Sequence, residues 1–457
     1  MQEQIRGCHD DQASNLEPLS VIFPFVDSIE RRYPIGQGAT VIEQEGAGTS
    51  VSSAAEQLAW LVAASARIPL PEQEIRQRVA PALLTASGGV AGFNAAAGVV
   101  GPLGALREGV DTQRGDQAQT MVQGGGRDYR LTVHVDQTGR INHLELTPDE
   151  APPGSWAEVD RHLAALRGRV SFAATVIHPD GACRFVHGLD PDVLRPIGSA
   201  FKLYVLGALG QAVAEGRARW EERLAIREEW KSLPSGILQD RPAGGALTLA
   251  EYADLMMSLS DNTATDHLIH RLGRESMARQ LRLFGHQQPR AVEPFLTTKG
   301  FFQLKYRATE RRRYLSTPVS ERIDMVEQLE QLPLPDISQP WTGPREIDRI
   351  EWFASATDIC RAYAGLLQLD QPEIGHALSL DTGGLGLDAG RFPTVWFKPG
   401  SEPGVTTLNY LARTASGRAM TASLMMSDPT EPLDTMDIFT RGRQIIRGAF
   451  HLLAQAH

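Results

Sequence analysis

Lysine is scarce in this chain, because only five lysines stand among its 45 basic residues, at positions 202, 231, 299, 305 and 398. A sequence that prefers arginine keeps lysine where arginine cannot serve. Arginine never gives up its proton, whereas a partly buried lysine can be tuned to do so. Lys202 stands three residues after Ser199 in the apolar run "PIGSAFKLYVLGALG". That placement makes it the first candidate for a chemical role.

Cysteine is rarer still, with three residues at positions 8, 183 and 360. Cysteines so few and so widely spaced predict neither a disulfide framework nor a zinc site. A reducing compartment and a disulfide-free periplasmic enzyme both fit this count.

An excess of positive charge is also missing. The formal net charge is −10, and nucleic-acid binding needs a basic surface, so we expect no nucleic-acid partner. The first residues contain no apolar run typical of a secretory signal, and the run after Arg31 and Arg32 is broken by proline and glycine. The uncharged stretch from Pro81 to Leu106 is rich in glycine and alanine, which favours buried helices over a membrane span. We therefore expect a cytoplasmic protein with no membrane partner.

The length of 457 residues exceeds one ordinary hydrophobic core, so two domains are expected. Residues 1–50 are interpreted as a partly disordered leader. Residues 51–150 combine helical periodicity with a hairpin around "DQTG", which predicts a small α+β domain. His134 and His143 lie on its predicted strands and are interpreted as face-lining polar residues. The proline-containing segment 147–155 is the predicted linker.

The second predicted domain, residues 156–457, begins with a hairpin around "HPDGA". A long helical region follows from Ser199 to about Gln368, in which Ser355 is a predicted helix N-cap. Strands resume at "TVWFK", "GVTTLNYLA" and "RAMTASLMM", and the chain closes on a helix. This order predicts an α/β (α+β) fold, with one sheet assembled from both ends of the domain around a helical insertion.

Ser199 and Lys202 are three residues apart, so in a helix both side chains lie on one face. A neutral Lys202 can accept the Ser199 proton and produce an activated nucleophile. The unpaired N–H groups at a helix N-terminus favour developing negative charge on the serine. A surface lysine on an amphipathic helix is the alternative interpretation.

A second motif, Ser260, Asp261 and Asn262, lies between two helical runs. Ser260 can relay a proton to a leaving group, and Asn262 can hydrogen-bond a substrate amide. Because serine, aspartate and asparagine are also preferred N-cap residues, a purely structural helix cap is the alternative.

A third motif begins at Lys398, which ends an apolar strand and precedes Pro399, Gly400 and Ser401. Lys398 can hold an anionic substrate group or tune the first lysine, Lys202. The backbone N–H of Ser401, with that of Ser199, can form an oxyanion hole. An ordinary lysine on an edge strand is the alternative.

Together the three motifs resemble the set S-x-x-K, S-D-N and K-x-G of class A β-lactamases and penicillin-binding serine hydrolases. The resemblance covers about residues 156–457 and implies a five-stranded antiparallel sheet flanked by helices. It implies no cofactor and a small-molecule substrate, a β-lactam or an ester. The site residues that it implies are the nucleophile Ser199, the general base Lys202, the proton shuttle Ser260, the electrostatic anchor Lys398, and the substrate-binding residues Asn262, Gly400 and Ser401.

Over its whole length the chain also resembles two-domain β-lactamase-like esterases of clavulanic acid biosynthesis, through "SLPSGILQD", "PFLTT" and "FKPGSEPGV". This resemblance implies ester cleavage with only weak β-lactam hydrolysis. It also implies that the leading domain is similar to the NTF2-like cone of steroid isomerases and cyclases.

Two positions depart from the class A pattern. Pro399 replaces the middle threonine or serine of the third motif, which removes a hydroxyl and a backbone N–H, so carboxylate recognition must change, through Ser401 for example. Glu293 in "VEPFLTT" stands near the position of the glutamate that drives deacylation in class A enzymes, and a solvated carboxylate is the alternative. If Glu293 is catalytic, deacylation is fast. A penicillin-binding or sensor protein acylated without turnover, and a D,D-carboxypeptidase, are the alternative functions.

Overall fold

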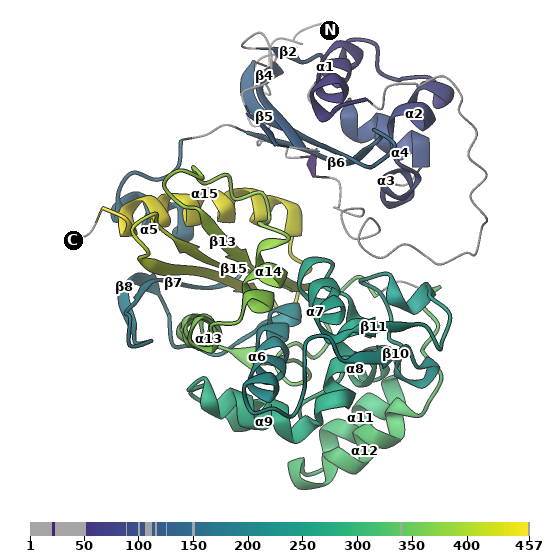
Figure 1. Cartoon of the computed structure of the whole chain (residues 1–457), viewed down its shortest axis with the longest axis vertical. Coiled ribbons are helices and arrows are strands. Elements are labelled where there is room, and N and C mark those ends of the chain that lie inside the picture. The colour runs from purple at the N-terminus through teal and green to yellow at the C-terminus, as the bar shows by residue number, and fades with distance from the viewer. Residues whose placement is uncertain are drawn as a thin grey trace, which may run out of the picture. The chain divides into compact units, whose positions relative to one another are not determined.

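The computed structural model divides into two compact units, Met1–Glu150 and Ala151–His457, each with its own hydrophobic core (Figure 1). The leader predicted over residues 1–50 lies outside the described residues, apart from Val21–Ile22. The structure describes residues 21–22, 52–87, 89–98, 101–105, 112–114, 117–124, 126–148, 151–338 and 341–455.

In the first unit, helices α1 to α4 precede strands β2 to β6, which agrees with the predicted order of helices before strands, while the short β1 comes before the helices. Helix α1 starts after Ser53, which exchanges hydrogen bonds with Glu56 in a capping box. In the uncharged stretch Leu83 and Phe93 are buried, which confirms the prediction of buried helices there. Within the described ranges, no helix has both the length and the apolar character that crossing a bilayer requires. The helices are α1 (Ala54–Ser65), α2 (Glu72–Arg78), α3 (Pro81–Ala86) and α4 (Gly89–Ala97).

An antiparallel sheet completes the first unit, in the order β1-β6-β5-β4-β2 with β3 beside β4. The predicted hairpin is β5 and β6, with Leu131 opposite Leu146 and His134 opposite His143. The two imidazole rings meet edge to face with centroids 5.0 Å apart. Helix α1 packs against β4 and β5. The strands are β1 (Val21–Ile22), β2 (Gly104–Ala105), β3 (Thr112–Arg114), β4 (Gln117–Gly124), β5 (Arg127–Val135) and β6 (Ile141–Pro148).

The second unit is built on an antiparallel sheet in the order β13-β15-β16-β7-β8. Strand β7, near its start, pairs with β16, near its end, with Ala174 opposite Ala422. This confirms the prediction of one sheet assembled from both ends of the domain. The short β14 pairs with β15 and adds a sixth strand to the five expected. The strands are β7 (Arg169–Ile177), β8 (Cys183–Leu189), β13 (Thr394–Phe397), β14 (Gly400–Glu402), β15 (Val405–Arg413) and β16 (Ala419–Ser427).

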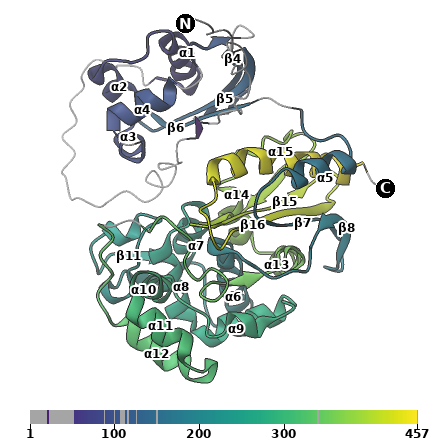
Figure 2. The same cartoon turned by 180° about the vertical axis from the view of Figure 1, so that it is seen from behind.

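Helices cover both faces of this sheet (Figures 1 and 2). Helices α5 (Trp156–Ala164) and α15 (Thr435–Leu453) lie on one face, and α13 (Ala356–Leu369) lies on the other, against β7 and β16. Every residue of β16 is therefore buried. On α15 the predicted apolar face is buried, formed by Ile445, Ile446, Phe450 and Leu453.

The helical insertion between the two ends of the sheet carries most of the candidate site. Its first helix, α6, packs against α13, α9 and α8, and nearly all of its residues are buried. Two short strand pairs, β10 (Arg223–Ala225) with β11 (Ala246–Thr248) and β9 (Arg195–Pro196) with β12 (Phe353–Ala354), lie outside the main sheet. The remaining helices are α6 (Lys202–Ala214), α7 (Leu249–Ser258), α8 (Asn262–Leu272), α9 (Arg274–Leu283), α10 (Thr298–Tyr306), α11 (Ala308–Ser316), α12 (Arg322–Glu330) and α14 (Pro372–Ser379).

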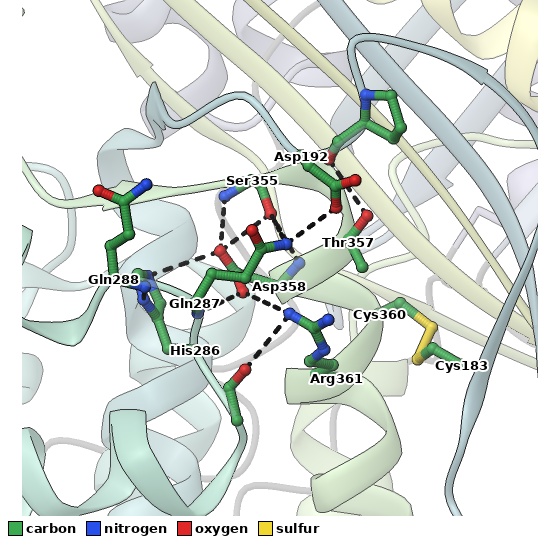
Figure 3. Close-up of polar contacts among 12 residues, drawn as sticks. Cys183, Asp192, His286, Gln287, Gln288, Ser355, Thr357, Asp358, Cys360 and Arg361 are labelled. Atoms are coloured by element: carbon green, nitrogen blue, oxygen red, sulfur yellow. Dashed lines mark hydrogen bonds and ion pairs between the residues drawn. A yellow bond between two sulfur atoms is a disulfide. The ribbon is translucent and has the colours of Figure 1, made fainter.

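The expectation that the cysteines form no disulfide is wrong for two of the three. Cys183 in β8 and Cys360 in α13 are joined by a disulfide with Cα atoms 6.2 Å apart (Figure 3). Because 177 positions separate them in sequence, spacing alone did not reveal the pair. Ser355 is the N-cap of α13, as predicted, and its N–H donates to Asp358 at 3.0 Å.

Candidate active site

Lys202 is the centre of the site, because its amine is fully buried and contacts both Ser199 and the S-D-N motif. Its Nζ lies 3.1 Å from Ser199 Oγ and 2.8 Å from Asn262 Oδ1. The hydroxyl and the carbonyl oxygen of Ser260 lie 2.9 Å and 2.6 Å from the same nitrogen. The folded chain therefore brings the S-x-x-K and S-D-N motifs together around one nitrogen atom.

The surroundings of Lys202 favour its neutral form. Burial, and after it the charge of Lys398, lower the pKa of Lys202 well below its ordinary value. The carbonyl oxygens of Ser260 and Asn262 can only accept hydrogen bonds, so two N–H groups of the amine serve them. The lone pair of the neutral nitrogen is then left for the hydroxyls of Ser199 and Ser260, and a hydroxyl can donate a hydrogen bond to it. A neutral amine can thus receive the Ser199 proton on its lone pair.

Ser199 lies in the 3₁₀ turn η1 (Gly198–Phe201) at the start of α6 and is half-buried. Gly198 has φ +48°, and a Cβ there would lie 2.8 Å from the Ser401 nitrogen, so this position requires glycine. A Cβ on Gly400 would lie 1.9 Å from the Ile197 oxygen and 2.9 Å from the Ser199 nitrogen. The backbones of η1 and β14 thus meet directly. The N–H groups of Ser199 and Ser401, the two predicted oxyanion donors, belong to these facing segments.

The two interpretations of the S-D-N motif apply to different residues. Asp261 is the structural cap, since its carboxylate accepts a hydrogen bond from Ala264 N–H at 2.8 Å and others from Ile237 and Leu238. Ser260, with φ +55°, turns its hydroxyl and carbonyl to Lys202. Ser260 therefore belongs to the site, while Asp261 fastens the loop that carries it.

Asn262 is oriented at both ends of its amide. Its Oδ1 accepts from Lys202, and its Nδ2 donates to the carbonyl of Leu233 at 3.0 Å. Ser235, two residues further along from Leu233, is exposed and donates to the Ser260 carbonyl at 2.8 Å. Sequence reasoning did not place the segment around Ser235 in the site. Its composition indicates a turn, but no local pattern shows that the turn packs against Ser260.

Lys398 follows β13 and is also fully buried, which excludes an exposed edge lysine. Its Nζ lies 3.4 Å from the Met257 carbonyl. Burial lowers the pKa of Lys398 to about 7, and Asp381 opposes that effect. Asn409 holds its backbone, because the Asn409 carbonyl accepts from Lys398 N–H at 3.0 Å and Nδ2 donates to the Lys398 carbonyl at 3.1 Å. The charge of Lys398 lowers the pKa of Lys202, so the two lysines are electrostatically linked.

Glu293 is not among the hydrogen-bond partners of Lys202 in the described part of the chain. It follows the short turn η4 (Pro289–Val292), and its side chain is exposed. Across the described ranges, no hydrogen bond or ion pair joins Lys202 to Glu293 or to any other carboxylate. At the third motif, Pro399 is half-buried and Ser401 is exposed beside buried Gly400.

Residues 158–333 of the chain match the model of a family described as the beta-lactamase enzyme family. The matched range contains Ser199, Lys202 and the S-D-N motif, and it ends before Lys398. Among curated proteins, none matches the chain. The match lies entirely within the second unit, whose antiparallel sheet has helices on both faces, and it covers the part of that unit from α5 to just after α12.

Three solved structures illustrate the likeness. The structure of PBP-A is similar over 66% of this chain and 100% of that chain, at 19% identity and a TM-score of 0.44. The beta-lactamase from Sphaerobacter thermophilus DSM 20745 is similar over 66% of this chain and 97% of that chain, at 20% identity and a TM-score of 0.45. A class A beta-lactamase described as the last common ancestor of Gram-negative bacteria is similar over 65% of this chain and 98% of that chain, at 15% identity and a TM-score of 0.46.

Proposed function

We propose that the second unit is a serine hydrolase that forms an acyl-enzyme on Ser199 and cleaves an ester or the amide bond of a β-lactam. One observation carries this proposal: the Lys202 amine is fully buried, lies 3.1 Å from Ser199 Oγ, and has a lowered pKa. A serine is a weak nucleophile unless a base accepts its proton. The buried amine supplies that base.

In the proposed reaction, Lys202 accepts the Ser199 proton as Oγ attacks the carbonyl carbon of the substrate. The oxygen of that carbonyl becomes negative and binds the N–H groups of Ser199 and Ser401. When the tetrahedral intermediate collapses, the bond to the leaving oxygen or nitrogen breaks. Ser260, which contacts Lys202, passes a proton to the leaving atom. The acyl group remains on Ser199 as an ester.

The positive end of Lys398 suits a substrate that carries an anionic group, such as the carboxylate of a β-lactam. Pro399 offers neither hydroxyl nor N–H to such a group. The exposed side chain of Ser401 is the nearest hydroxyl in the same segment, so we assign the second contact to it. We assign Asn262 to substrate binding. It lies beside Lys202, and its side-chain amide is oriented by hydrogen bonds with Lys202 and with the carbonyl of Leu233.

The rate at which water releases the acyl group from Ser199 decides whether the protein is a hydrolase or is acylated without turnover. Because Glu293 is exposed and no carboxylate contacts Lys202 among the described residues, activation of the hydrolytic water falls to Lys202 or Ser260. We infer that acyl groups from simple esters are released quickly and those from β-lactams slowly. The same observation favours the second candidate function, a penicillin-binding protein that is acylated by β-lactams without turnover.

Intact-protein mass spectrometry tests the proposal. The protein is mixed with a fluorescent penicillin and, separately, with a chromogenic acyl ester, and Ser199→Ala is the control. The proposal expects a mass gain on the wild type alone, which decays within minutes for the ester and persists for the penicillin. In Glu293→Gln, decay is expected to be unchanged. Absence of adduct and of turnover with both probes would contradict the assigned chemistry.

A further inference from the structure

Three ionisable side chains meet behind the two segments that carry the Ser199 and Ser401 N–H groups. Glu351 precedes buried Trp352, Glu402 is the last residue of β14, and Lys305 belongs to α10. Lys305 is fully buried, and the side chains of Glu402 and Glu351 are almost so. The three residues come from segments far apart in the sequence. The mechanism above gives none of them a role.

The two glutamates are linked to the two segments proposed to form the oxyanion hole. Glu351 Oε2 accepts hydrogen bonds from Gly198 N–H at 3.2 Å and from Trp352 N–H at 2.6 Å. Gly198 directly precedes the nucleophile Ser199. Glu402 directly follows Ser401 in β14. Glu351 therefore binds the η1 segment and Glu402 is part of the β14 segment, and the N–H groups of Ser199 and Ser401 belong to these two segments.

Lys305 forms an ion pair with Glu402. Its Nζ donates to Glu402 Oε1 at 2.9 Å and to the Arg345 carbonyl at 2.6 Å. The ammonium also lies 4.9 Å from the ring centroid of Phe301 and 5.0 Å from that of Trp341. Aromatic faces and a carboxylate both attract an ammonium group.

The two remaining carboxyl oxygens have no donor of their own. Glu351 Oε1 and Glu402 Oε2 are buried without a partner that carries a hydrogen, and the two side chains lie within hydrogen-bonding reach of each other. Two adjacent carboxylates in a buried site cannot both ionise near neutral pH. A single proton between them satisfies both oxygens. It also makes the cluster neutral, with one ammonium and one negative charge shared by the pair.

We propose that Glu351 and Glu402 share one proton and, with Lys305, hold the η1 and β14 backbones at the separation that the oxyanion hole needs. This inference rests on the proposed function, and the three side chains are positioning residues, because none touches the substrate. Burial raises the pKa of both carboxyls, and Glu402 raises that of Glu351 further, so the proton belongs on Glu351. An ionised pair would repel and would place negative charge behind the developing oxyanion.

Replacement of Glu351 by two residues of similar size separates this role from simple packing. In Glu351→Gln the amide oxygen can accept from Gly198, and the amide nitrogen can donate to Glu402. Glu351→Leu offers neither bond. Because the bound substrate carries no oxyanion until Oγ attacks, Glu351→Leu should lower the acylation rate about 100-fold with unchanged KM, as expected when the two backbone segments are displaced by about 1 Å. Glu351→Gln should stay within about threefold of wild type by the same criterion.

Acylation by the chromogenic ester, thermal unfolding and infrared spectra at neutral pH are measured for wild type and both variants. Labelling of wild-type Ser199 reports on the proposed function, and the ratio of variant to wild-type rates reports on this inference. The wild-type minus Glu351→Gln infrared spectrum needs no turnover and should show the band of a protonated carboxyl. If Glu351→Leu does not fold, Glu402→Gln replaces it and should remain active while losing that band. A folded Glu351→Leu with the wild-type rate, or a difference spectrum that contains only a carboxylate band, would overturn the proposal.

Discussion

At the scale of single residues, lysine scarcity turns out to mark burial. All five lysines of the chain are buried, and the surface positive charge is left to arginine. Lys202 and Lys398 lie in the site, and Lys305 lies behind it. Lys231 forms an ion pair with Glu228, and Lys299 donates a hydrogen bond to the backbone carbonyl of Glu229. A compact ammonium needs three acceptors, whereas a guanidinium needs five, which fewer buried settings supply. In this chain, lysine is therefore used at buried positions, including the candidate active site.

The lowered pKa of Lys398 predicts a pH dependence that differs between substrates. Burial lowers the pKa of Lys398 to about 7, so above that pH it loses the charge that holds an anionic group. Lys202, in contrast, must be neutral to accept the Ser199 proton, so its contribution rises with pH. Acylation by an anionic penicillin should therefore rise and then fall with pH, whereas acylation by a neutral ester should rise to a plateau.

Stopped-flow acylation rates for both substrates across the pH range test this. The matched control is Lys398→Met, which should lose the alkaline fall with penicillin. With the ester it should still give a rise to a plateau, moved to higher pH because the charge of Lys398 no longer lowers the pKa of Lys202. An identical profile for the two substrates would show that Lys398 does not hold the anionic group.

At the scale of elements, the site depends on how closely η1 and β14 approach. Gly400 lies where a Cβ would meet the Ile197 oxygen at 1.9 Å, so Gly400→Ala must push the two segments apart. We expect its free energy of unfolding to fall by about 1–3 kcal/mol, typical of overpacking. The acylation rate should fall about 100-fold, which is the usual cost of losing one oxyanion donor.

Differential scanning calorimetry and the ester assay measure the two effects. Gly245→Ala is the control, since the nearest atom to its added Cβ is 3.7 Å away. This variant should match wild type in both assays. A Gly400→Ala protein with full activity would show that β14 contributes no donor to the oxyanion.

The disulfide joins two elements that the sequence separates widely. Cross-linking β8 to α13 closes a loop of 177 positions and restricts the unfolded chain. We expect Cys183→Ala/Cys360→Ala to lower the free energy of unfolding by about 2–5 kcal/mol, and to leave acylation unchanged because neither cysteine contacts the site. Chemical denaturation with and without reductant measures this. A reductant-induced shift that also appears in the double variant would assign the effect to something other than this bond.

At the scale of the whole molecule, patterns local in sequence were predictable and contacts between distant segments were not. Alternation and turn residues indicated the hairpins β5–β6 and β7–β8, because strand periodicity and turn chemistry are local. The three motifs indicated Ser199, Lys202 and Lys398 for the same reason. The disulfide and the pairing of Glu351 with Glu402 join segments whose approach is set only by tertiary packing. The exposed position of Glu293 belongs to this second group, because exposure depends on which distant segments pack over its loop.

The division of the chain into two units leads to the last prediction. Every residue assigned to the site lies in Ala151–His457, and the main core of that unit contains only residues from Val159 onward. A fragment of residues 151–457 should therefore unfold cooperatively and acylate Ser199 with the small ester at a rate within about twofold of the full chain, as expected for an independent domain. Circular dichroism melting and the mass-spectrometric adduct assay measure both properties. A folded fragment that binds the ester with raised KM would instead assign the first unit a part in shaping the substrate cleft, and a fragment without a cooperative transition would show that the second unit depends on the first for its stability.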